Sequence, residues 1–346
     1  MKKTARILLA IAFALTVLAF TGCRALSTTV PAKALSAGPL PANAYPVTIA
    51  NYDTDGNPYS YRYDHAPNRV VVSHPGATEL LLEFGLEDRI LATVAPYGPP
   101  LPRLAEKYAR LTLLKAQFVP SQEEVLAMQP DLIIGWAHHF VPHELGEVRT
   151  WGKRSIATYI LPSSMTKSRP TVETAVYPAI ADIGKIFGIT DQTDRYIQQL
   201  QTRINRIKAS VQSVPRKKTV IVLQNHGNGR FTLYDESYLI THLVDIAGGK
   251  NLNERPATFV GAENILAFDP DSIIFVTFSK DGEELTHQQA CAELRSIKEL
   301  SGMRAVRQAN IIDLPFFTVN NGGVRTIDAI EKIAHELYPE RFPEQH

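Results

Sequence analysis

One pattern of apolar and polar positions occurs twice along the chain. From Glu123 the sequence runs Glu-x-Val-Leu-Ala-Met-x-Pro-Asp-x-Ile-Ile, and from Glu263 it runs Glu-x-Ile-Leu-Ala-Phe-x-Pro-Asp-x-Ile-Ile. Each copy predicts a short amphipathic helix, a Pro-Asp turn that cannot continue the helix, and a buried strand. Self-similarity of this kind indicates two related halves. We therefore expect two α/β lobes, each presenting a glutamate on the outer face of its short helix.

The first lobe is predicted to span residues 46–168. Residues 45–63 alternate around Asp55-Gly-Asn-Pro58, a pattern typical of a β-hairpin at the edge of the lobe. Apolar runs after it predict strands, and these alternate with helical segments, which implies a parallel sheet. The expected strands are 69–73, 89–94, 132–136 and 155–161, and the expected helices are 77–84, 123–128 and one that ends at Thr150.

A helical linker is predicted over residues 169–216, followed by the second lobe over 217–346. The linker's last stretch places apolar residues at spacings of three and four, which predicts one long helix with a single buried stripe: Ile197, Leu200, Ile204, Ile207 and Val211. A helix of roughly 20 residues spans about 30 Å, enough to bridge both lobes. The alternative is an ordinary surface helix of the first lobe. The second lobe repeats the plan, with strands at 219–223, 272–278 and 310–314 and helices at 238–247, 263–268 and 324–337.

The chain begins with a pattern typical of an export signal. Lys2, Lys3 and Arg6 precede the apolar run 7–20, which is too short for a comfortable membrane span, and small residues lead to Cys23. This arrangement resembles a bacterial lipobox, with Phe20 in place of its usual leucine, so residues 1–23 are predicted to be a lipoprotein signal peptide and Cys23 the lipidated residue. Ordinary secretion and a retained helix are the alternatives. Residues 24–45, rich in Ala, Ser and Pro, are predicted to be a flexible tether.

Composition adds limits to this organisation. The length of 346 residues and a hydrophobic content of 45% allow a core in each of two domains. A formal net charge of +1 argues against a broad nucleic-acid-binding surface. The two cysteines, Cys23 and Cys291, give no disulfide framework, and Cys291 is expected to be a small, partly buried residue.

Candidate binding residues gather at the predicted strand ends. Ligands of parallel α/β sheets bind beyond the carboxyl ends of the strands, so side chains placed there are expected to line a cleft between the lobes. Aromatic walls with a few cations suit a large, partly anionic, aromatic or macrocyclic ligand, although core packing explains any one aromatic equally well. The candidates are His74, Tyr97, Trp136, His138, His139, Asn225, His226, Arg230, Phe278, Phe316, Phe317 and Arg325.

Motifs for other chemistry are weak. Gly227-x-Gly229 follows a strand, but Thr232 stands where a dinucleotide loop needs its third glycine. The sequence contains neither a Gly-rich loop ending in Gly-Lys-Ser/Thr nor a Gly-x-Ser-x-Gly elbow. His139 and His143 are four residues apart and could share a helix face in a zinc site, but Pro142 limits that helix. Cleft-lining or solvated histidines are the preferred interpretation, with no bare-metal site.

The whole pattern resembles the periplasmic binding proteins that serve ABC importers of iron–siderophore complexes, haem and cobalamin. The resemblance rests on the lipobox-like start, Arg69-Val-Val-Val with Glu79, Leu86-Glu-Asp-Arg-Ile, both Glu…Pro-Asp units, Ala247-Gly-Gly-Lys-Asn and the final Tyr338-Pro-Glu. It implies that Glu123 and Glu263 dock onto arginines of a permease dimer; helix-surface glutamates without a partner are the alternative. It also implies lobes joined by a long helix and a largely preformed cleft.

The ligand is less sharply indicated. Trp136 stands where cobalamin binders can carry a tryptophan against the corrin, and Arg325 resembles the arginine that siderophore binders offer to catecholate or carboxylate groups. Haem would need an axial ligand such as His74, Tyr97 or His226. The preferred order is iron–siderophore, cobalamin, haem.

We therefore expect a monomeric lipoprotein, anchored at the outer face of the cell membrane, that delivers a metal chelate to an ABC permease and its ATPase. It would need no cofactor of its own and bind no nucleic acid. The alternatives are an enzyme such as a tetrapyrrole metal chelatase, and a surface receptor that serves no permease.

Overall fold

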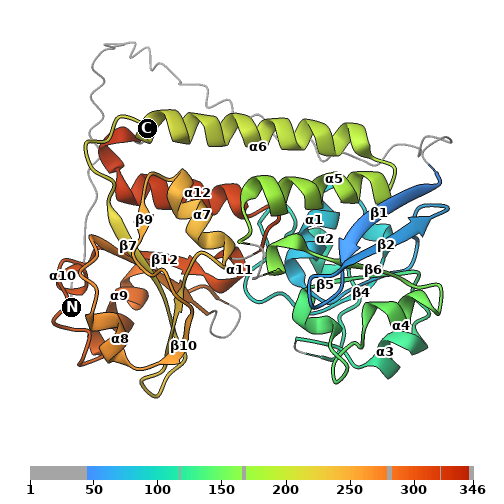
Figure 1. Ribbon diagram of the computed structural model, residues 1–346, viewed down its shortest axis with the longest axis horizontal. Helices are drawn as coiled ribbons and strands as arrows, with labels where there is room; N and C mark the ends of the chain where they lie inside the picture. Colours follow the sequence, from blue (N-terminus) through green and yellow to red (C-terminus); the bar gives the residue numbers. More distant parts are fainter. Residues whose placement is uncertain (1–44, 117, 166–168, 279–282, 320, 343–346) are drawn as a thin grey trace, which may run out of the picture. The chain divides into compact units, whose positions relative to one another are not determined.

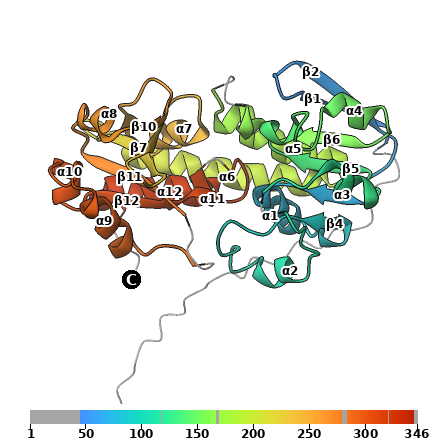
Figure 2. The ribbon, with the colours of Figure 1, turned by 90° about the horizontal axis from the view of Figure 1, so that it is seen from below.

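The computed structural model describes residues 45–342 except 117, 166–168, 279–282 and 320, all within one compact unit. Cys23 and its tether lie outside these residues. In the described part, no helix is both long enough and apolar enough to span a bilayer. The two lobes are built on separate sheets (Figure 2), as the repeat predicts. The exact lobe boundaries remain predictions.

The first lobe holds a four-stranded parallel sheet in the order β4-β3-β5-β6. Its predicted strands and hairpin are confirmed, but the helix expected to end at Thr150 is wrong. Residues 137–140 form a 3₁₀ turn, Gly146 takes a positive φ of 82°, and a separate helix begins only at Val148. The elements are β1 (Val47–Tyr52), β2 (Pro58–Tyr63), β3 (Val70–Val72), α1 (Pro75–Glu83), β4 (Ile90–Thr93), α2 (Ala105–Ala109), α3 (Gln122–Ala127), β5 (Leu132–Gly135), α4 (Val148–Gly152) and β6 (Ala157–Ile160).

The second lobe holds a six-stranded sheet in the order β10-β8-β7-β11-β12, with β9 also paired to β7. The expected parallel strands are present, but β8 and β10 pair antiparallel and make the sheet mixed. The elements are β7 (Thr219–Asn225), β8 (Phe231–Tyr234), α7 (Leu239–Ile246), β9 (Lys250–Asn251), β10 (Ala257–Val260), α8 (Ala262–Leu266), β11 (Ser272–Thr277), α9 (His287–Ser296), α10 (Arg304–Arg307), β12 (Ile311–Pro315), α11 (Phe316–Val319) and α12 (Thr326–Leu337).

Helix α6 (Thr190–Val211) bridges the lobes. It runs beside α5 (Tyr177–Ile186) at one end and α12 at the other, and it also contacts α7 (Figure 1). Its buried residues include Leu200, Ile204, Ile207 and Val211, which confirms the apolar stripe. These side chains join one core cluster that contains residues of both sheets, so the lobes share a hydrophobic core through α6.

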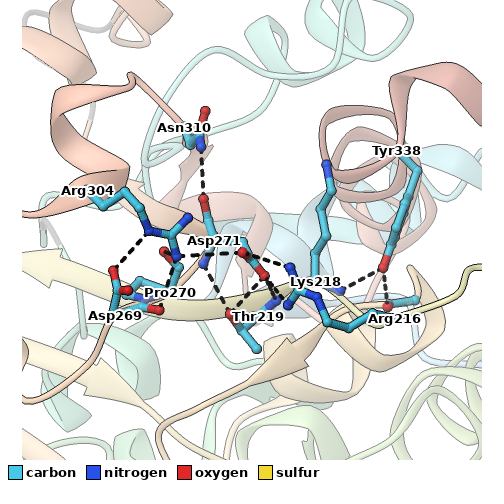
Figure 3. A network of polar contacts seen from close by, with 10 residues as sticks. Arg216, Lys218, Thr219, Asp269, Pro270, Asp271, Arg304, Asn310 and Tyr338 are labelled. Atoms are coloured by element: carbon cyan, nitrogen blue, oxygen red, sulfur yellow. Dashed lines mark hydrogen bonds and ion pairs between the residues drawn. The ribbon is translucent and has the colours of Figure 1, made fainter.

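The repeated unit has the same backbone role in each lobe. Asp131, before β5, accepts hydrogen bonds from the backbone N–H groups of Asn68 (2.8 Å) and Arg69 (2.9 Å). Asp271, before β11, accepts one from the backbone N–H of Thr219 (2.8 Å) (Figure 3). Each aspartate therefore ties the amino end of one central strand to the amino end of its neighbour. This leaves the carboxyl ends of the strands free for the site.

Candidate functional site

A cavity of about 280 Å³ lies between the carboxyl edges of the two sheets. The first lobe contributes residues that follow β5 and β6, and the second contributes residues of β7, β8, β10 and the segments after β8 and β12. Thr232 and Tyr234 reach it together because alternate residues of a strand face the same side. The lining residues are Trp136, His138, Ser163, Ser164, Gln224, Thr232, Tyr234, Tyr238, Thr258 and Phe316.

Aromatic rings from both lobes meet at this cavity. The Trp136 ring stacks on His74 with centroids 4.0 Å apart and lies 6.4 Å from Phe316. Phe316 stacks on Phe278 at 4.8 Å and lies 6.2 Å from Tyr97. Six predicted site residues, the five just named and His138, are thus brought into one cluster. Trp136, His138 and Phe316 line the cavity itself.

The indole N–H of Trp136 has an unusual status. It is buried and has no hydrogen-bond partner among the residues that the structure describes. A buried donor left unpaired carries a desolvation penalty of about 1–3 kcal/mol. An acceptor atom of a bound ligand could remove that penalty after a small movement of the ring.

His74 and His139 are held as neutral structural groups. His74 is the N-cap of α1, and its Nδ1 accepts from the backbone N–H of Gly76 (3.1 Å). Nδ1 of His139 lies 2.9 Å from the Ser73 hydroxyl and 3.4 Å from the Trp136 backbone N–H. Burial lowers the pKa of His139 to about 3, and burial with neighbouring histidines lowers the pKa of His74 well below its usual range. Neither ring offers Nδ1 to a metal.

The histidine pair considered for zinc is not assembled. The turn that contains His139 ends at Phe140, and Val141 is extended with ψ of 157°, so His139 and His143 do not share a helix face. His139 is buried whereas His143 is exposed. Across the described ranges, no group of three or more His, Cys, Asp or Glu residues is placed to hold a metal ion.

Arg325 occupies a different place from the one expected. Its side chain is only 7% exposed and forms a two-pronged ion pair with the fully buried Glu79, with Nε–Oε2 at 2.7 Å and Nη2–Oε1 at 2.8 Å. Nη2 also donates to the carbonyl of Pro99 (2.7 Å), and the guanidinium lies 4.2 Å from the ring centroid of Phe317. Arg325 thus joins α12 of the second lobe to α1 of the first and is not part of the cavity lining.

Three other candidates gather at the turn between β7 and β8. Asn225 Nδ2 donates to Glu293 (3.0 Å), and exposed Arg230 donates through Nη1 to the carbonyl of Phe259 (3.0 Å). His226 contacts the hydroxyl of Thr232, which does line the cavity, at 2.8 Å. None of the three is among the described residues that line the cavity.

The sequence predicted none of the described hydroxyl-bearing residues of the lining: Ser163, Ser164, Thr232, Tyr234, Tyr238 and Thr258; it also missed Gln224. Phe-Thr-Leu-Tyr at 231–234 alternates as a strand should, and this signal could have found β8 and the shared side of Thr232 and Tyr234. Ser163 and Ser164 lie in a short 3₁₀ turn after β6 that no sequence pattern marks.

The two repeat glutamates occupy equivalent exposed positions. Glu123 lies in the first turn of α3, and Glu263 lies in the first turn of α8. Glu123 makes no hydrogen bond or ion pair with any described residue. Among the described residues, the side chain of Glu263 hydrogen-bonds only to its neighbour Asn264, at 3.3 Å. Both carboxylates are therefore available to a partner.

Known proteins share this architecture. A family model described as periplasmic binding protein matches residues 70–317. The ABC transporter substrate-binding lipoprotein YvrC of Bacillus subtilis (strain 168), described as uncharacterized, is 21% identical over 308 residues, covering 87% of this chain and 88% of the relative.

Solved structures agree on the fold. A periplasmic binding protein from Veillonella parvula DSM 2008 superposes with a TM-score of 0.74 at 22% identity, covering 85% of this chain and 99% of that one. A protein of an ABC-type Fe³⁺-hydroxamate transport system from Saccharomonospora viridis DSM 43017 gives a TM-score of 0.67 at 20% identity, with the same coverage.

Proposed function

This chain belongs to the periplasmic binding protein family, and we propose that it captures an iron(III)–siderophore complex and delivers it to the permease of an ABC importer. It is a substrate-binding protein of the importer class that handles siderophores, haem and cobalamin, and not an enzyme. We further propose that it is exported and held at the outer face of the membrane by lipid on Cys23, as the lipoprotein relative suggests.

The cavity between the sheets is the observation that carries the ligand proposal. Aromatic rings from both lobes and a set of hydroxyl and amide groups converge on it, as in sites that enclose a small molecule. The shared core under α6 and the Glu79–Arg325 pair hold the lobes at a defined separation, which favours a preformed site over a large closure. A compact octahedral chelate suits such a cleft, with part of it remaining outside the cavity.

Delivery is proposed to rest on Glu123 and Glu263. Their equivalent positions on α3 and α8 provide one exposed carboxylate per lobe. A permease dimer presents two equivalent surfaces, so two matched carboxylates can each bind an arginine through charge-assisted hydrogen bonds.

Cobalamin is the second candidate because Trp136 offers a flat ring at the cavity wall. Haem receives less support. Nδ1 of His74 already accepts a backbone hydrogen bond, so the neutral ring carries its proton on Nε2 and offers iron no lone pair there. Burial raises the pKa of Tyr97 to about 12, which disfavours the phenolate that an iron ligand requires.

The test is a fluorescence titration of the full chain in mild detergent with ferric siderophores, cyanocobalamin and haem, using inner-filter controls. We expect saturable quenching by a ferric siderophore that is lost in Trp136→Phe and retained in Trp151→Phe, because Trp151 lies on α4 and is buried in another cluster. Binding of cyanocobalamin alone would contradict the iron proposal in favour of the second candidate.

A further inference from the structure

We propose that the cleft selects chelates without net negative charge, the class to which ferric hydroxamates belong, and rejects polyanionic ones such as ferric catecholates. This inference rests on the proposed function and names the class of ligand. It departs from the sequence-based expectation of a partly anionic ligand, which depended on arginines in the cleft.

The described part of the cavity wall is built from uncharged side chains. Of the ten described residues that line it, none is Asp, Glu, Lys or Arg. Its single titratable base is His138, whose pKa is lowered by desolvation of the ring although the residue as a whole is exposed. His138 is therefore neutral near pH 7, and the ten described lining residues carry no formal charge there.

The two arginines expected to bring positive charge to the cleft, Arg325 and Arg230, do not provide it at the cavity wall. Nε and Nη2 of Arg325 donate to the carboxylate of Glu79, and Nη1 lies 3.9 Å from Glu284. The charge of Arg325 is thus matched by carboxylates before any ligand binds. Arg230 lies outside the wall and is exposed, so solvent and salt screen its charge.

Three hydroxyl groups at the cavity wall direct their protons to acceptors within the protein. Ser163 donates its proton to the carbonyl of Asn321 (3.3 Å), and Ser164 donates to the carbonyl of Leu161 (2.7 Å). The Tyr234 hydroxyl donates to the side-chain oxygen of Gln224. Three hydroxyl protons are therefore already used within the protein, and these groups can offer a ligand only lone pairs.

Together these features disfavour an anion. A polyanionic chelate would lose water and receive neither a cation nor these hydroxyl protons in return, which is unfavourable for a charged group. A hydroxamate siderophore offsets the charge of iron(III), so its complex loses less on desolvation. The oxygen atoms of such a chelate match the neutral donors at the wall, the Trp136 indole and the Gln224 amide, and its amide N–H groups match the hydroxyl lone pairs.

The test compares two iron chelates of opposite charge class on the full chain in detergent: iron(III)–desferrioxamine and iron(III)–enterobactin. We expect the hydroxamate to bind at least about 100-fold more tightly, a difference of about 2.7 kcal/mol. Equal or tighter binding of the catecholate would overturn the inference while leaving the siderophore function in place.

A charge-insertion variant sharpens the result. Thr258 lines the cavity from an exposed position of β10, so it tolerates a long side chain. Thr258→Lys should strengthen catecholate binding about tenfold relative to the uncharged, similarly long Thr258→Met. An unchanged ratio between these two variants would contradict charge selection at this wall.

Two further ligands separate this inference from the function on which it rests. Cyanocobalamin is uncharged and haem carries carboxylates. If cyanocobalamin binds and neither iron chelate does, the iron function fails but the charge rule holds. If haem binds tightly, the charge rule fails. If none of the four ligands binds, both proposals fail.

Discussion

The two copies of the helix–turn–strand unit use the same aspartate in different electrostatic surroundings. In the first lobe, the carboxylate of Asp131 is held by two backbone N–H groups. In the second, Asp271 also faces Arg216, with contacts at 2.8 and 3.1 Å, and Arg304 at 3.6 Å (Figure 3). The Arg216 bond is the main reason that the pKa of Asp271 is lowered. The common feature is the backbone tie between strands, and the arginines are an addition of one lobe.

The lobes also differ in what they bring to the cleft. Among the described lining residues, the first lobe supplies Trp136, His138 and two serines, whereas the second supplies all of the tyrosine and threonine hydroxyls and Gln224. The aspartate ties therefore lie at the amino ends of the strands, and the residues of the cleft lie at the carboxyl edges of the sheets. The repeat fixes the amino ends, and the loops at the carboxyl ends are free to differ because they carry no part of that tie.

The largest expected effect on stability comes from removing the carboxylate of Glu79, which links the lobes through Arg325. Glu79→Ala leaves the buried guanidinium of Arg325 with only one described carboxylate nearby, that of the partly exposed Glu284 at 3.9 Å, which should lower the free energy of unfolding by about 3–5 kcal/mol. Urea denaturation measures this, and a single transition would show that the lobes unfold together. Glu83→Ala is the control, since Glu83 lies one turn later on α1 in a more exposed pair with Arg103 and should cost under about 1 kcal/mol. Equal losses in the two variants would contradict a role for the buried pair.

As the pH falls, protonation of His139 should destabilise the first lobe before protonation of Asp271 has any effect. The unfolded chain protonates its histidines near pH 6.5, whereas the folded chain holds the pKa of His139 at about 3. Stability should therefore be full above about pH 6.5 and fall as the pH decreases, with a loss on the order of a few kcal/mol complete near pH 3. The lowered pKa of Asp271 acts only below its ordinary value of 3.8.

The measurement for this prediction is unfolding free energy between pH 7 and 4. His139→Asn should flatten the slope, because it removes the titrating ring while keeping a short polar group beside Ser73. The exposed His143→Asn serves as the control and should leave the slope as it is. A slope unaffected by His139→Asn would show that other groups dominate acid sensitivity.

Removing each aspartate tests how far the two units are equivalent. Asp131→Ala and Asp271→Ala should each cost about 1–3 kcal/mol, since the first leaves two backbone N–H groups without an acceptor and the second leaves one, together with the Thr219 hydroxyl. The arginines should add little to the second value, because Arg216 is exposed and Arg304 is partly exposed, and high salt should erase that addition. A difference that persists at high salt would mean that the backbone ties themselves are unequal.

The smallest effect on stability is expected at the glutamates. Glu123→Ala and Glu263→Ala should each change the free energy of unfolding by less than about 0.5 kcal/mol, because both side chains are exposed. Ligand affinity should also remain, while the double variant should abolish uptake in a reconstituted importer. Glu299→Ala, another exposed glutamate, should leave uptake intact. Normal uptake by the double variant would remove the docking role.

The elements with strong periodicity were predictable, and the details at their ends were not. The stripe on α6 and the paired strands β5 and β11 follow from apolar spacing alone. Strands β8 and β10 were missed because they are short and antiparallel on an otherwise parallel plan. At the site, aromatic residues after strands could be placed, since the carboxyl edge is common to all ligands of such sheets.

Arg325 shows why the rest of the site could not be predicted. Its sequence position marks it as near the cleft, but only the three-dimensional structure shows that Glu79, 246 positions away, takes its charge. The acceptors of the serine and tyrosine hydroxyl protons are likewise distant in sequence or lie in turns that no sequence pattern marks. The place of the cleft could therefore be predicted from the sequence, whereas the charge of the ligand depends on these contacts and stays a proposal.

The joint between the lobes has a practical consequence for optical sensing. Binding proteins that close on a hinge can carry one dye on each lobe and report ligand as a change in energy transfer. With α6 packed on both lobes and the Glu79–Arg325 pair buried between them, such a dye pair should show little change here. A single polarity-sensitive dye on Thr258, exposed yet at the cavity wall, is the better design, since the ligand would displace water beside it.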